Sequence, residues 1–66
     1  MYFPSDYQTI GQPVRVTPYA RHGRGAVYDV TIMNQVTGRI QTFETYATCP
    51  ANACAFAINL AVREQF

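Results

Sequence analysis

The residues of this chain that could do chemistry are few and scattered. Its single histidine, His22, lies in a glycine-flanked stretch with no carboxylate or second histidine near it in the sequence. The four acidic residues show no spacing that would pair two of them for acid–base work. Cys49 and Cys54 would point about 140° apart on a helix, so they cannot bridge each other, and no CxxC motif suggests zinc. We therefore expect no catalytic residue, no metal and no cofactor, and we predict that the protein is not an enzyme.

The basic residues carry more information than the acidic ones. All five are arginines, and the formal net charge is +1. Proteins that bind nucleic acid through phosphate contacts alone usually have a large basic excess, which this chain lacks. Arginine prefers planar, bidentate or stacked contacts, which occur in both nucleic-acid and protein recognition. Arg21 and Arg24 bracket Gly23 in the stretch RHGRG, which predicts a hairpin turn that also serves as a recognition edge.

The size and composition of the chain favour a binding protein. Its 66 residues make one small domain, and 48% of them are hydrophobic while only 14% are charged. Low surface charge in a small domain suggests that a partner or a second copy covers part of the surface. The first residues resemble no signal peptide, and no apolar run is long enough to cross a membrane. We expect a cytoplasmic protein that does not bind a membrane.

Alternating hydrophobicity predicts three strands in the main domain, residues 14–66, which follows an extended arm over residues 1–13. The arm contains two prolines and several aromatic side chains, which we expect to cap the core, and its pattern also allows a short strand at Tyr7–Ile10. Short turns join the three strands into an antiparallel meander, and Asn34 and Gly38 suit the second turn. The predicted strands are residues 14–20, 26–33 and 38–47.

From Thr48 the period changes to that of a helix, with Thr48 as the expected N-cap. Alanines recur at every fourth position, so the helix can lie close against the sheet. In the third strand Ile40 and Phe43 have opposite parity, which requires either a bulge or one of them facing away from the core. The fold class is α+β, a β-β-β-α arrangement with the helix on one face. The predicted core comprises Val14, Val16, Tyr28, Val30, Ile32, Ala53, Ala57, Leu60 and Ala61.

Two surfaces are candidates for binding. The sheet face away from the helix is expected to combine arginine, hydroxyl, amide and aromatic groups, although Asp29 among them weakens a phosphate-binding interpretation. Together with the first hairpin, this face supplies the predicted partner-binding residues Arg15, Tyr19, Arg21, Arg24, Arg39 and Gln41. The helix is apolar over more than half of its circumference, which predicts a homodimer or a tight complex through Phe56, Val62 and Phe66.

The strand-hairpin-strand-helix pattern over residues 23–62 resembles several families of small domains. AP2-type and integrase arm-binding domains read the major groove with the free face of such a sheet, and double-stranded RNA-binding domains end in a similar sheet and helix. Small phage inhibitors, including anti-CRISPR proteins, have comparable folds. The resemblance implies the same α+β fold and either of two functions, inhibition of a partner protein or binding of nucleic acid. We expect a non-catalytic inhibitor or adaptor of phage or mobile-element type that masks the surface of a partner protein, or alternatively a nucleic-acid-binding domain.

Overall fold

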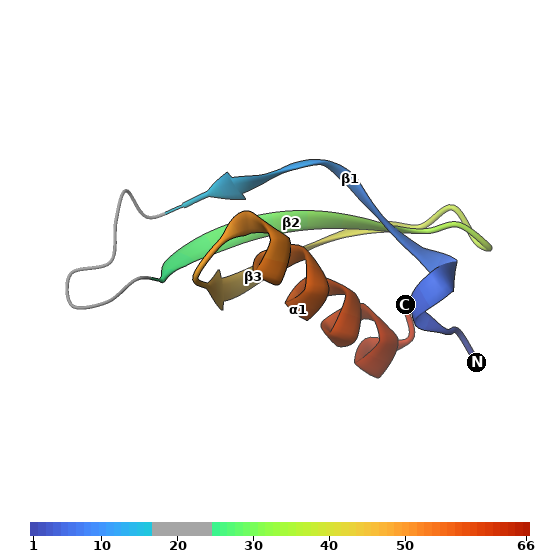
Figure 1. Ribbon diagram of the computed structural model, residues 1–66. Helices are drawn as coiled ribbons and strands as arrows, with labels where there is room; N and C mark the ends of the chain where they lie inside the picture. Colours follow the sequence, from blue (N-terminus) through green and yellow to red (C-terminus); the bar gives the residue numbers. More distant parts are fainter. Residues whose placement is uncertain (17–24) are drawn as a thin grey trace.

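The computed structural model describes residues 1–16 and 25–66, and its architecture confirms the predicted α+β fold. A short 3-10 helix, η1 (Pro4–Asp6), precedes the strand β1 (Tyr7–Arg15). The strands β2 (Ala26–Asn34) and β3 (Ile40–Ala47) follow, and the helix α1 (Pro50–Glu64) closes the chain. The strands form one antiparallel sheet in the order β1-β2-β3, and α1 crosses one of its faces (Figure 1).

The central strand β2 sets which residues face the helix. Its side chains alternate between buried and half-buried along the whole strand, as expected for a strand covered on one face only. The even-numbered residues from Ala26 to Asn34 face α1, and the odd-numbered residues from Val27 to Met33 face away. Directly opposed residues of neighbouring strands share a face, so the pairings of β2 assign faces to β1 and β3.

The first strand differs from its predicted bounds and orientation. It begins at Tyr7 rather than Val14, and its register shifts between Ile10 and Val14. Gly11 lies in this irregularity with φ 68°, a left-handed conformation that glycine adopts without steric cost. Beyond the shift Val14 opposes Asp29, on the face away from the helix. The prediction that Val14 and Val16 are core residues is therefore wrong, since they are 62% and 48% exposed.

The third strand has no bulge, so Ile40 and Phe43 point to opposite faces of the sheet. Its pairing with β2 is continuous from Ile40 to Ala47. Phe43 opposes the buried Val30 and is itself buried, whereas Ile40 faces away from the helix and is 60% exposed. The core therefore takes Phe43 and leaves Ile40 at the surface.

Alanine allows α1 to lie directly on the sheet. Ala53, Ala57 and Ala61 have no exposed surface, as the sequence predicts, and Leu60 packs partly buried against the core. The predicted Tyr28, Val30 and Ile32 are buried opposite them. The core also contains residues that the prediction missed: Tyr7, Ala26, Phe43 and Ala47. The N-cap is Cys49 rather than Thr48, with Pro50 in the first turn, and the Thr48 hydroxyl accepts a hydrogen bond from the Asn52 side chain at 3.0 Å.

Asn34 organises the turn between β2 and β3 and joins it to the end of the chain. Its side-chain Oδ1 accepts hydrogen bonds from the backbone N–H groups of Val36 and Thr37, at 2.8 and 3.2 Å. Its Nδ2 donates to the carbonyl oxygen of Phe66 at 2.9 Å. Gly38 has φ 79°, which confirms the predicted turn. A single buried amide thus connects two distant segments.

The two ends of the chain meet beside this turn (Figure 1). The Gln65 side chain accepts a hydrogen bond from the Tyr2 backbone N–H at 2.6 Å and donates one to the Tyr2 carbonyl at 2.8 Å. The Phe66 ring packs between Tyr7 and Phe43, with centroid distances of 5.3 and 5.7 Å. Among the aromatic residues of the predicted arm, Tyr7 is buried and Tyr2 packs against the core, as predicted, whereas Phe3 is 60% exposed.

Candidate functional site

Among the described residues, the structure does not bring together the arginines of the predicted partner-binding surface. Tyr19, Arg21 and Arg24 lie outside the described residues, so their predicted role remains a prediction. Arg15 and Arg39 are both exposed, but they oppose Tyr28 and Asn34, which are six positions apart along β2. At 3.3 Å per residue this separation is about 20 Å, so the two guanidinium groups belong to opposite ends of the sheet.

The faces assigned to these residues also need correction. Arg15 opposes Tyr28 and Gln41 opposes Ile32, both of which face the helix. The Gln41 side-chain Nε2 lies 3.5 Å from Oε1 of Glu64 in α1, and Arg39 has the same parity as Gln41. The strand register therefore places Arg15, Arg39 and Gln41 on the sheet face that α1 crosses, not on the free face. The face assignment is wrong because the strand registers depend on the Gly11 irregularity and on the β2–β3 turn, which alternation alone does not reveal. The role of these residues in partner binding stays a prediction.

The sheet face away from α1, here called the uncovered face, is apolar with an acidic centre. Large apolar side chains are exposed along both of its outer strands, and Tyr46 at its far end is 63% exposed. Contiguous exposed apolar surface of this kind marks interaction sites. By register, the uncovered face consists of Gln8, Ile10 and Val14 from β1, Val16 directly after β1, Val27, Asp29, Thr31 and Met33 from β2, and Ile40, Thr42, Glu44 and Tyr46 from β3.

Two carboxylates oppose each other in the middle of this face. Asp29 and Glu44 are direct cross-strand partners, a pairing that destabilises a sheet when both side chains carry the same charge. Neither forms an ion pair with any residue in the described ranges 1–16 and 25–66. Beside them the hydroxyl oxygens of Thr31 and Thr42 are 3.1 Å apart and share a hydrogen bond. The sequence showed Asp29 on this face, but the register was needed to place Glu44 opposite it.

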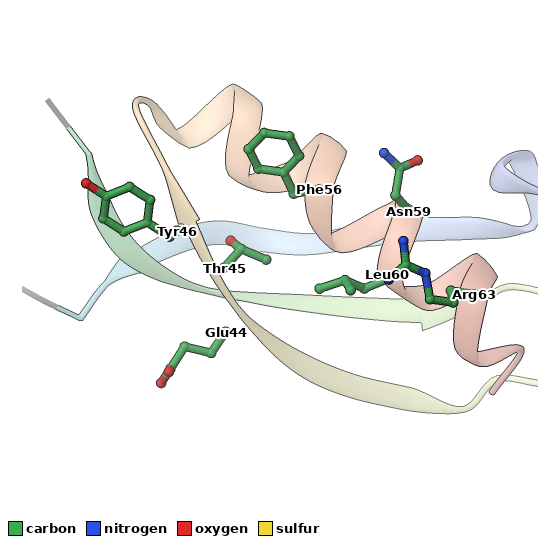
Figure 2. A pocket seen from close by; sticks show the side chains of 7 residues that line it. All are labelled: Glu44, Thr45, Tyr46, Phe56, Asn59, Leu60 and Arg63. Carbon is green, nitrogen blue, oxygen red and sulfur yellow. The ribbon is translucent and has the colours of Figure 1, made fainter.

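A second surface feature is a cleft between α1 and the outer edge of β3. Its volume is about 330 Å³. Figure 2 shows Thr45 of β3 and Leu60 of α1 pointing toward each other, with Phe56 toward one end and Arg63 toward the other. The Glu44 side chain points away from the cleft. The lining residues are Glu44, Thr45, Tyr46, Phe56, Asn59, Leu60 and Arg63.

The residues of the predicted helix interface occupy different environments. Phe56 is 46% exposed and lines the cleft. Val62 and Phe66 pack partly buried against the core, and Phe66 contacts Tyr7 and Phe43. Of the three, Phe56 is the residue most accessible to a partner. Whether these residues form an interface stays a prediction.

The Tyr7 hydroxyl is buried without a hydrogen-bond partner among the residues that the structure describes. Burial raises the pKa of this phenol above its ordinary value, and the nearby Tyr2 and Asp6 add to the rise. A buried hydroxyl without a partner costs free energy, so it matters for stability. We assign this hydroxyl no binding role.

Within the described residues, no three potential metal ligands come together, and both cysteines are free thiols. The helices of this part of the chain are too short or too polar to cross a membrane. The structure defines a class of protein: a three-stranded antiparallel sheet with one face covered by a helix and the other open. Comparison with known families, curated proteins and solved structures finds no match to the chain.

Proposed function

We propose that this chain is a small, non-catalytic protein-binding module, an inhibitor or adaptor that masks a partner surface with its uncovered face. The observation that carries the proposal is the combination of exposed apolar side chains with the opposed carboxylates of Asp29 and Glu44 on one sheet face. An apolar surface with a few charged groups is typical of protein interfaces.

The charge on this face favours a protein over a nucleic acid. A sheet that enters a DNA groove needs cationic side chains near the phosphates, and the described part of the uncovered face contains none. Asp29 and Glu44 would instead repel phosphate. They suit a partner that places a lysine or arginine between apolar contacts, because that cation would relieve the repulsion between the two carboxylates.

The negative charge of the uncovered face also disfavours a homodimer in which two copies of this chain pack these faces against each other. Two copies packed face to face at the same strand level would bring two Asp29–Glu44 pairs together. The uncovered face supplies no cation from the described residues to offset them. The partner we propose is therefore a different protein with a basic, apolar contact surface.

Capture from a nuclease-treated lysate of the source cells, followed by titration with the purified captured protein, tests this function. The double variant Asp29→Lys/Glu44→Lys should raise the dissociation constant at least about tenfold and slow association at low salt. The matched control is Arg39→Glu, a charge reversal at an exposed residue off this face, which should leave binding unchanged.

Three results would contradict the proposal. One is capture of nucleic acid alone from an untreated lysate, with nothing captured once the lysate has been treated with nuclease. Another is a partner whose affinity does not respond to the double variant. The third is a homodimer, seen by analytical ultracentrifugation, whose interface covers the uncovered face.

A further inference from the structure

We propose that the outer edge of β3 binds an extended peptide segment of a partner protein as a fourth strand, with one apolar side chain seated in the cleft beside α1. This inference concerns the edge of the sheet and is independent of the function proposed for the uncovered face. It depends on the backbone groups of β3, on the cleft and on Arg63.

The backbone of β3 offers hydrogen-bonding groups to such a strand. β3 is an edge strand, paired only with β2 among the described residues. The Asn34 backbone N–H donates to the Arg39 carbonyl at 2.8 Å, which marks that pair as directly hydrogen-bonded. Because bonded and non-bonded pairs alternate along an antiparallel ladder, the N–H and C=O groups of Glu44 and Tyr46 point toward the open edge. Edge groups of this kind template the addition of a strand.

The cleft lies where an added strand would place a side chain. A peptide residue opposite Thr45 points to the same side of the sheet as Thr45, which is the helix side. That side holds the cleft of about 330 Å³ between β3 and α1, and Phe56 and Leu60 supply its apolar walls (Figure 2). The cleft is near the lower limit for small-molecule sites and suits a single apolar side chain better than a large ligand.

Arg63 indicates the charge of the peptide. Its guanidinium lines the end of the cleft away from Phe56 and forms no ion pair with the described residues (Figure 2). In an antiparallel addition, the peptide residue two positions after the one opposite Thr45 lies opposite Phe43, on the helix side. A carboxylate there would pair with Arg63. The occupant is thus a segment with an apolar residue followed two positions later by an acidic one.

A second copy of this chain fits the edge less well. If two β3 strands paired antiparallel around Thr45, Arg63 of one copy would approach the start of α1 in the other. That region begins Cys49-Pro50 and has no acidic residue in its first turn, and a helix start carries positive partial charge. The only acidic residue of β3 is Glu44, and its side chain points to the opposite face.

The test uses a fluorescently labelled, end-blocked heptapeptide with leucine at position 4, glutamate at position 6, lysine at position 1 and valine or threonine elsewhere. Binding to the full chain is followed by anisotropy, and the amide resonances of Glu44 and Tyr46 by NMR. N-methylation at position 5 blocks an amide that faces β3 and should weaken binding at least about tenfold. N-methylation at position 4, whose amide faces away, should change affinity by no more than about twofold.

Arg63→Glu should weaken binding of this peptide about tenfold and favour a peptide with lysine at position 6. Arg39→Glu is the control and should leave both affinities unchanged, as should Asp29→Asn on the uncovered face, which separates this inference from the proposed function. The inference is overturned if the peptide does not bind saturably at millimolar concentration, or if both methylations weaken binding equally. It is also overturned if Arg63→Glu has no effect, or if the chain dimerises through β3.

Discussion

Replacing Asn34 by alanine should be among the most destabilising single changes to this domain. The Asn34 side chain is fully buried and makes three hydrogen bonds, to the backbone N–H groups of Val36 and Thr37 and to the Phe66 carbonyl. Each such bond contributes about 1 kcal/mol net, so Asn34→Ala should lower the free energy of unfolding by about 2–4 kcal/mol. A domain of this size has roughly 3–10 kcal/mol in total, so the variant should be close to unfolding.

Urea and thermal unfolding followed by circular dichroism would measure the effect, with an expected fall in melting temperature of roughly 10–30 °C. Amide exchange adds a local readout, because the Val36 amide should lose protection in conditions where β2 remains folded. The control is Asn59→Ala on the exposed side of α1, which should change stability by less than about 0.5 kcal/mol. If Asn34→Ala were as mild as Asn59→Ala, the link between the turn and the end of the chain would contribute little, and the reasoning would be refuted.

Three further predictions follow from burial and register. Tyr7→Phe removes a buried hydroxyl that has no described partner, so the melting temperature should hold or rise. Because the folded-state pKa of Tyr7 is raised, wild-type stability should fall as pH rises from the ordinary phenol value of about 10 through the raised value. Tyr7→Phe should be flatter there, and an equal slope in both proteins would argue against this assignment. Ala57→Glu buries an unpaired charge under α1 and should abolish cooperative unfolding, whereas Ala55→Glu on the exposed side should not; similar melting curves would mean that the wrong helix face is assigned. Val14→Thr should alter the free energy of unfolding by less than about 0.5 kcal/mol, since Val14 is exposed. If chemical denaturation showed that the variant loses several kcal/mol of this free energy, Val14 would be a core residue after all.

Much of the fold follows from local sequence patterns. The alternation over Ala26–Asn34 and the fourfold spacing of Ala53, Ala57 and Ala61 each reflect the geometry of one element, so neither requires knowledge of its neighbours. The same holds for the turn from Asn34 to Gly38, which depends on local backbone preferences. These patterns were enough to predict the β-β-β-α order and the side of the helix that is buried.

Tertiary structure decided what the surfaces contain. The register shift between Ile10 and Val14 determines which β1 side chains meet the helix, and it depends on pairing with β2 rather than on alternation within β1. The opposition of Asp29 to Glu44 and the cleft beside Arg63 arise from residues that only strand pairing and helix packing bring together. The sequence by itself determined the second and third strands and the helix, because their periods are local, but it did not determine where the first strand begins. Only the tertiary structure determined the apolar, acidic character of the open sheet face, because that depends on how separate strands are aligned.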